Sequence, residues 1–266
     1  MTDSLVCSVL ASGSTGNAVY VQAGTTRLLI DSGVSLRQLQ VALDQIKVDG
    51  NRLDAVLVTH EHSDHVKGLK AVIRKWELPV YTSDGTWSSI SSMWKDEDAV
   101  TARIIRANSV FTLGQIAIEP FALSHDALEP LGFCFHFQGK KLVLATDLGY
   151  VSDRIKQVAQ GAHAFILETN HDVDMLRTGP YPWHLKRRIL GDKGHLSNET
   201  AAEFLVDCLS EQTHSVFLAH LSKENNRETL AHDALSLRLK DYDHDLAEQI
   251  TLRMTNPLAA TPLLAV

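Results

Sequence analysis

Short apolar runs recur along the chain and alternate with segments in which apolar residues follow a helical spacing. The runs are rich in β-branched residues and are bounded by turn residues, which is typical of buried strands. We expect strands at 5–10, 18–21, 27–30, 53–58, 79–82, 103–106, 115–121, 132–137, 141–145, 164–167 and 215–219, with an edge strand at 246–254. We expect helices at 36–47, 66–76, 87–94, 152–160, 183–190, 197–208 and 228–239.

These elements predict an α/β protein with four layers. Strands with a few helices fill the first half of the chain, and the second half repeats this style. Two such halves can pack sheet against sheet with their helices outside, which gives an αββα sandwich. We expect a single domain over residues 1–266, in which 257–266 is a tail of undefined order.

The composition narrows the class of protein. A formal net charge of −7 excludes the global basic field of many nucleic-acid binders, so such a contact needs a local patch or a bound metal. Cys7, Cys134 and Cys208 are far apart and form no CxxC motif, which favours buried thiols in a reducing compartment. The sequence shows no signal peptide and no apolar stretch that could cross a membrane. We therefore expect a cytoplasmic protein without a membrane partner.

The densest polar segment, 59–65, directly follows the apolar run 53–58. Within it stand His60, His62, Asp64 and His65, and a helical pattern begins at residue 66. Imidazole and carboxylate groups together suit zinc, manganese or iron, and a strand-to-helix turn can aim alternate side chains at one centre. A surface loop that collected histidines by chance would not be expected at the end of a core strand. The segment therefore predicts a metal site.

Other residues that can bind a metal also follow apolar strands. They are Asp31, His125, Asp147, His171 and His220. Ligand sites tend to lie at the carboxyl ends of strands, where loops from several strands meet. We therefore expect these side chains to converge on the 60–65 cluster.

A small-residue loop at 11–17 could contact an anion. Its glycines, with Ser14, Thr15 and Asn17, can offer backbone N–H groups and polar side chains. A plain hairpin turn is the alternative interpretation.

A basic run offers a second contact for a nucleic-acid backbone. Lys186, Arg187 and Arg188 form the densest basic patch, although they could equally be a solvated helix face. Asn225, just past the last predicted core strand, either contacts a phosphate or caps the next helix.

The motif His60-x-His62-x-Asp64-His65, with Asp31 before it and His125, Asp147 and His220 after it, resembles the metallo-β-lactamase superfamily. The resemblance extends from about residue 5 to 225. Finer features resemble the YycJ (WalJ) group, which are bacterial nucleases of the phosphodiesterase branch. These features are the segments 11–17, 124–127, 129–133, 170–172, 194–198 and 219–222.

The resemblance implies two divalent metal ions, for which zinc, manganese and iron all suit the ligands. It assigns His60, His62 and His125 to one ion, Asp64, His65 and His220 to the other, Asp147 to a bridging position, and Asp31 to an outer position that orients a ligand imidazole. It also assigns catalytic roles to Asp64, which orients the attacking group, and to His195, which protonates the leaving oxygen. A polar loop residue is the alternative for His195. His171 is either a substrate contact, an outer partner of a ligand or a structural hydrogen-bonding residue.

The function that the resemblance implies is hydrolysis of phosphodiester bonds, above all as a 5′-to-3′ DNA exonuclease with DNA as its partner. Asp147 stands where true β-lactamases of this fold carry cysteine, and the interval from Asp147 to His220 is too short for a β-CASP domain. A small-molecule hydrolase acting on a cyclic phosphate, thioester or lactone is the first alternative. A non-catalytic metal-binding regulator is the second. The oligomeric state stays open.

Overall fold

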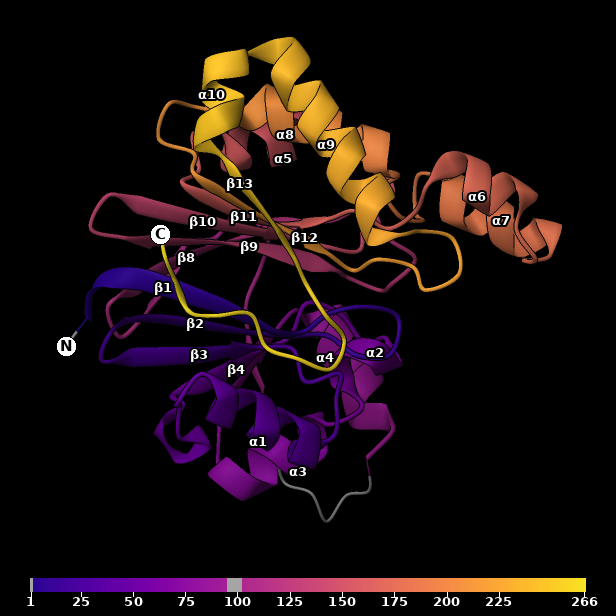
Figure 1. The fold of residues 1–266 in the computed structure, drawn as a ribbon. Helices are drawn as coiled ribbons and strands as arrows, with labels where there is room; N and C mark the ends of the chain where they lie inside the picture. The colour runs from indigo at the N-terminus through magenta and orange to yellow at the C-terminus, as the bar shows by residue number, and fades with distance from the viewer. Residues whose placement is uncertain (1, 95–101) are drawn as a thin grey trace.

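The computed structural model describes residues 2–94 and 102–266, which form two stacked β-sheets with helices on their outer faces (Figure 1). The first sheet has the order β14 (Leu264–Ala265), β1 (Thr2–Ala11), β2 (Ala18–Gly24), β3 (Thr26–Ile30), β4 (Ala55–Leu57), β5 (Val80–Thr82), β6 (Ala102–Ile104). The second has the order β13 (Thr251–Met254), β12 (Ser215–Ala219), β11 (Ala164–Glu168), β10 (Lys140–Ala145), β9 (Leu131–Phe137), β8 (Ile116–Ala122), β7 (Phe111–Leu113).

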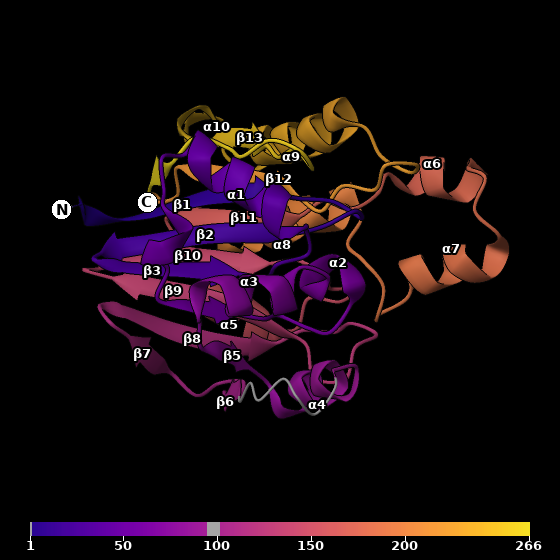
Figure 2. The same ribbon diagram turned by 90° about the horizontal axis from the view of Figure 1, so that it is seen from below.

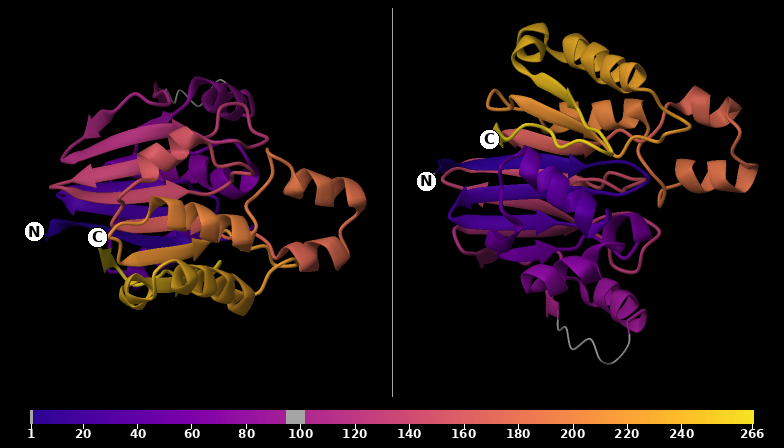
Figure 3. Two further views of the ribbon diagram at one scale, coloured as in Figure 1. Left: turned by 90° about the horizontal axis from the view of Figure 1, so that it is seen from above. Right: turned by 60° about the horizontal axis from the view of Figure 1, so that its bottom comes forward.

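Helices cover the outer face of each sheet. Those that follow strands of the first sheet are α1 (Leu36–Gln45), α2 (Ser63–Val66), α3 (Leu69–Trp76) and α4 (Asp84–Ser92), with a 3₁₀ turn at Gly50–Arg52. Those that follow strands of the second are α5 (Asp153–Ala159), α8 (Asn198–Cys208), α9 (Glu228–Tyr242) and α10 (His244–Gln249). A further pair, α6 (Val173–Thr178) and α7 (Trp183–Leu190), stands out from the sandwich on one side (Figures 2 and 3).

Apolar side chains alternate along the strands and so build three separate cores. Along β2, Val19 and Val21 face the second sheet, whereas Tyr20 faces helices α1 and α3. Along β11, Ile166 faces the first sheet and Phe165 faces α5 and α8. The three buried layers confirm the predicted αββα sandwich.

The centre of each sheet is parallel, which decides where a site can form. Strands β3 to β6 run parallel to one another, and so do β10 to β13. The loops at the carboxyl ends of the parallel strands of each sheet therefore gather at one edge.

The C-terminal region differs from the prediction in two respects. The predicted edge strand 246–254 instead forms part of helix α10 and strand β13. The Asp243 side chain caps α10 by accepting a hydrogen bond from the Leu246 N–H, and only 251–254 pairs at the sheet edge. The tail 257–266 is ordered: β14 pairs with β1, and Thr261 accepts a hydrogen bond from the Val9 N–H (2.9 Å). The sequence prediction also missed β7 and α6, which are short elements.

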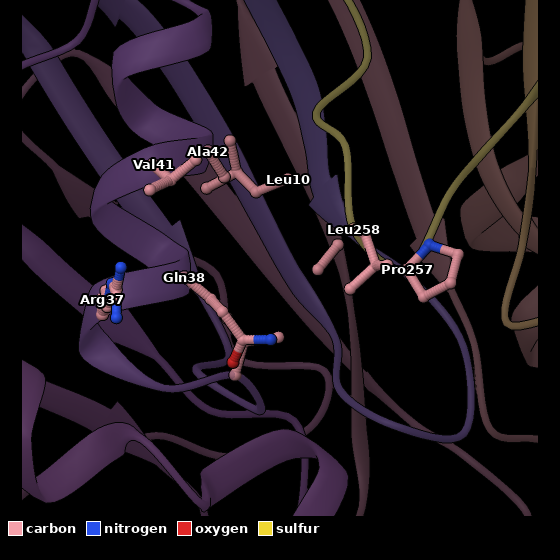
Figure 4. Close-up of a pocket in the computed structure, with 9 residues that line it drawn as sticks. Leu10, Arg37, Gln38, Val41, Ala42, Pro257 and Leu258 are labelled. Atoms are coloured by element: carbon pink, nitrogen blue, oxygen red, sulfur yellow. The ribbon is translucent and has the colours of Figure 1, made fainter.

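The same tail forms one wall of an apolar pocket of about 280 Å³ (Figure 4). Pro257 and Leu258 lie on one side of this pocket, Val41 and Ala42 of α1 on the other, and Leu10 between them. The tail thus packs near α1 as well as pairing with β1. None of the helices that the structure describes is long and apolar enough to cross a bilayer.

The three cysteines are buried and unpaired, as predicted. Burial raises the pKa of Cys7, Cys134 and Cys208 to about 12, so almost no reactive thiolate is present at pH 8. We predict that a thiol reagent at pH 8 modifies none of them in the native protein, and modifies all three after unfolding in guanidinium chloride. Rapid modification of any thiol in the native protein would contradict this burial.

Candidate metal centre

Three residues that end strands share an unusual backbone conformation. Asp31 follows β3, Asp147 lies two residues after β10, and His220 follows β12. Their φ angles are 60°, 62° and 57°, which is the left-handed region that few residues other than glycine adopt. This local turn directs each side chain across the edge of the sheets, and such conformations concentrate at functional sites.

A first group of donors consists of His60, His62 and His125, whose candidate ligand atoms lie within 4.8 Å of one another. Nε2 of His125 is 3.3 Å from Nδ1 of His62. Nδ1 of His125 donates to the carbonyl oxygen of Gly194 (3.0 Å), which leaves Nε2 free to bind a cation. Nε2 of His60 is buried and makes no hydrogen bond to any described residue. An imidazole nitrogen without a partner in this position fits a metal ligand.

A second group consists of Asp64, His65 and His220. Oδ2 of Asp64 lies 3.5 Å from Nε2 of His65 and 3.4 Å from Nε2 of His220. The opposite ring nitrogens are held from outside: Nδ1 of His65 donates to Asp31, and Nδ1 of His220 donates to Glu168, both at 2.8 Å. These bonds fix the tautomer in which Nε2 faces the centre.

Asp147 lies between the two groups and is buried. Its Oδ1 is 3.9 Å from Nε2 of His125, and its Oδ2 is 3.3 Å from Nε2 of His65. One carboxylate therefore reaches both triads. The described residues thus form a donor cluster of nitrogen and oxygen atoms of the kind that holds divalent cations.

The donor cluster contains buried ionised groups whose charges affect one another. Burial opposes ionisation of Asp147, but the imidazoles of His220 and His65 outweigh it and keep its pKa well below the usual range. Burial also opposes protonation of His65, yet the carboxylates of Asp147 and Asp31 raise its pKa to about 10. Metal binding favours the neutral imidazole and would displace that proton.

Glu168, at the end of β11, is a residue that the sequence analysis passed over. Its Oε1 accepts hydrogen bonds from Nδ1 of His195 and of His220, both at 2.8 Å. Its Oε2 accepts from the backbone N–H groups of Leu148 (3.2 Å) and Leu196 (3.0 Å). Burial opposes ionisation of Glu168, but the charge and hydrogen bond of His195, with the bond from His220, lower its pKa to about 2. Its place at a strand end, like that of Asp31, was the available signal.

His195 lies beside both triads. Its ring centroid is 5.0 Å from that of His125 and 5.3 Å from that of His220. Burial opposes its protonation, but the carboxylate of Glu168 outweighs burial and raises its pKa above the ordinary value. The side chain is 19% exposed and borders the pocket over the donor cluster. It is therefore placed to hold a proton next to a bound substrate.

Three of the seven residues predicted to bind substrate are exposed. Ser14 and Thr15 form the tip of their loop, and Ser14 borders the pocket. Arg187 lies on the exposed side of α7. These positions leave the three side chains free to contact a ligand.

The other four residues are buried. Asn17 donates to the Asp64 carboxylate (3.3 Å), and Asn225 donates to Oγ of Ser222 (3.3 Å). His171 is buried and neither ring nitrogen has a described partner; burial lowers its pKa to about 4. The prediction that Lys186 is part of an exposed basic patch is wrong. Its Nζ points inward and donates to the carbonyl oxygens of Arg177 and Gly179, both at 2.7 Å, at the end of α6.

The pocket over the donor cluster has a volume of about 240 Å³. Tyr181, Leu185, Arg188 and Ile189 from the α7 region form one wall. Arg188 also donates to Asp126, whose Oδ1 lies 3.4 Å from Nε2 of His125. The projecting helices therefore border the candidate metal centre itself.

The chain is similar to proteins of known family and to solved structures. A model described as the β-lactamase superfamily domain matches residues 26–220. The chain is 44% identical over 256 residues to the exodeoxyribonuclease YycJ of Bacillus anthracis, which covers 96% of this chain and 97% of that protein. It is 41% identical over 258 residues to the exodeoxyribonuclease WalJ of Streptococcus pneumoniae serotype 2, covering 96% of each. The solved structure of the metallo-β-lactamase fold protein YhfI from Bacillus subtilis is similar, with a TM-score of 0.72 at 17% identity over 97% of this chain and 99% of that one.

The role of Glu168 generates a prediction about metal affinity. Glu168→Gln keeps an acceptor oxygen but loses the charge that orients His220, so we expect the affinity for Mn²⁺ to fall by about 10- to 100-fold. Isothermal titration calorimetry measures this directly. Glu119→Gln is the matched control, because Glu119 lies on β8 and pairs with Arg154 of α5 rather than with any histidine of the donor cluster. Equal affinity in the Glu168 variant and the wild type would contradict the assignment.

Proposed function

The chain belongs to the β-lactamase superfamily with the metallo-β-lactamase fold, and we propose that it is a metal-dependent hydrolase that cleaves phosphodiester bonds from the 5′ end of DNA. The observation that carries the proposal is the pair of donor triads on either side of Asp147. The similarity to two exodeoxyribonucleases over nearly the whole chain supports DNA as the substrate.

In this proposal the triads hold two divalent ions, one at His60, His62 and His125 and the other at Asp64, His65 and His220. Zinc, manganese and iron all fit these nitrogen and oxygen donors. When bound, such a pair supplies a nucleophile from water and stabilises charge on the attacking and leaving oxygens.

Two residues of the chain, Asp64 and His195, assist the attack of water and the departure of the leaving oxygen. Burial opposes ionisation of Asp64, but His220 and His65 lower its pKa, so its carboxylate can accept a hydrogen bond from the attacking water. The oxygen of that water bonds to phosphorus while the P–O3′ bond breaks. His195 donates its proton to the departing O3′, and Glu168 keeps the imidazole in position. The proton released by water passes to solvent, from which His195 is protonated again.

The exposed predicted residues Ser14, Thr15 and Arg187 are proposed to contact the substrate. The buried residues Asn17, His171 and Asn225 are proposed to support the site beneath the substrate. Asn17 does so by orienting the carboxylate of Asp64. Three buried, unpaired thiols and a DNA substrate agree with a location in the cytoplasm.

The small-molecule alternative would be favoured by a closed pocket. Instead, the pocket over the donors borders a second cavity, with which it shares Ser14 and Ser222. That arrangement leaves room for a polymer to continue beyond the cleaved bond. The non-catalytic alternative is disfavoured by the complete set of donors.

Digestion of a 5′-phosphorylated, end-labelled DNA strand in the presence of Mn²⁺ tests the proposal. We expect wild type and His244→Ala, an exposed histidine of α10, to release mononucleotides progressively from the 5′ end. We expect His62→Ala to be slower by more than about 100-fold, because a lost ligand exceeds the effect of a lost outer partner. If DNA stays intact while wild type hydrolyses a chromogenic phosphodiester, the small-molecule alternative replaces this proposal.

A further inference from the structure

The pocket over the donor cluster adjoins a groove of about 260 Å³. Ser14 and Ser222 line both spaces, so the two spaces lie side by side at the edge of the donor cluster. The groove runs between the loop at 12–15, the loop at 221–227 that follows β12 with the start of α9 at Glu228, and Pro257 of the C-terminal tail. We call it the strand groove.

Basic side chains border the strand groove in a protein whose net charge is negative. Lys223 and Arg227 are exposed on one side. On the other side, Nζ of exposed Lys67 donates to the carbonyl oxygen of Thr15 (3.0 Å), which brings a third cation to the loop tip. Glu228 also lines the groove and exposed Glu224 lies in the same loop, but the three basic side chains outnumber these two carboxylates. This local field favours an anionic ligand over the −7 background.

The groove also offers apolar surface and a helix end. Leu221 and Pro257 form part of its lining. Helix α9 begins at the groove after Arg227, and no side chain of the described residues caps its N-terminus. A positively charged groove that follows the phosphate backbone is one means by which proteins hold single strands without reading their sequence.

The position of the proton donor indicates which part of the substrate lies where. The His195 backbone N–H donates to the carbonyl oxygen of Ile189 at the end of α7 (3.0 Å), so His195 belongs to the α7 side. The His220 N–H donates to Oγ of Ser12 (2.7 Å), so that ligand belongs to the side of the strand groove. A leaving O3′ next to His195 puts the released nucleotide under α7. The retained strand then has to leave past Ser14 and Ser222.

We propose that the strand groove binds the retained part of the DNA strand, with Lys223 and Arg227 contacting its backbone phosphates. The pocket under α7 then holds only the 5′-terminal nucleotide. This inference rests on the proposed nuclease function, and it assigns to the groove a role that neither the metal ligands nor His195 can perform. It also explains why the tip of the 11–17 loop, with Ser14 and Thr15, is exposed between the two spaces.

The test compares wild type with the double variant Lys223→Ala/Arg227→Ala. Each protein is assayed on a long 5′-phosphorylated single strand and on a chromogenic phosphodiester too small to reach the groove. We expect the ratio of kcat/KM on the strand to that on the small ester to fall about tenfold in the variant, mainly through KM. We also expect the dependence of log KM on log salt concentration to weaken by about 1.4, since each lost single-strand phosphate contact removes about 0.7.

Lys240→Ala is the matched control, because Lys240 is exposed near the other end of α9, outside the groove. It should leave both the ratio and the salt dependence unchanged. If wild type digests DNA and the double variant keeps the wild-type ratio and salt dependence, the inference is wrong and the proposed function stands. If wild type fails to digest DNA at all, the proposed function fails and takes the inference with it.

Discussion

Buried carboxylates surrounded by imidazoles are the constraint on which the rest of this structure depends. Asp31, Asp147 and Glu168 are all nearly or fully excluded from solvent, and each accepts hydrogen bonds from, or closely approaches, a histidine of the centre. An ionised carboxylate is costly to bury unless it is paired, and a pair that loses one partner is costlier still. The same arrangement that would destabilise an isolated fold becomes favourable when divalent cations sit among these donors. The centre is therefore suited to bind divalent cations.

The sandwich provides the rigid frame that holds those charges in place. Its central strands are parallel within each sheet, so several chain segments reach the same edge, where Asp31, Asp147 and His220 adopt left-handed backbone conformations. Three separate apolar layers fix the strands from both faces. Around this rigid centre, the loop at 11–17, the projecting α6–α7 pair and the loop at 221–227 supply the walls. Ligands to the metal come from strand ends, whereas surfaces for substrate come from loops and added helices.

Much of this could be predicted from the sequence because the decisive signals are local. His60, His62, Asp64 and His65 are nearly consecutive, and a strand end followed by a polar residue is visible in one window of sequence. Glu168 also lies at a strand end, but its role depends on His195 and His220, which are 27 and 52 residues away and in no common window of sequence. The basic run at 186–188 suggested a uniform patch, but carbonyl oxygens at the end of α6 draw Lys186 inward. The tail escaped prediction because its partners in β1 lie some 250 positions earlier, as with Thr261 and Ser8.

The central claim is that two cations bind on either side of Asp147. Anomalous X-ray diffraction from crystals of the protein grown with Mn²⁺ tests it most directly. The account predicts two manganese peaks, one among His60, His62 and His125 and the other among Asp64, His65 and His220, with the Asp147 carboxylate between them. A single peak, or peaks bound elsewhere while these donors keep only their hydrogen bonds, would contradict it.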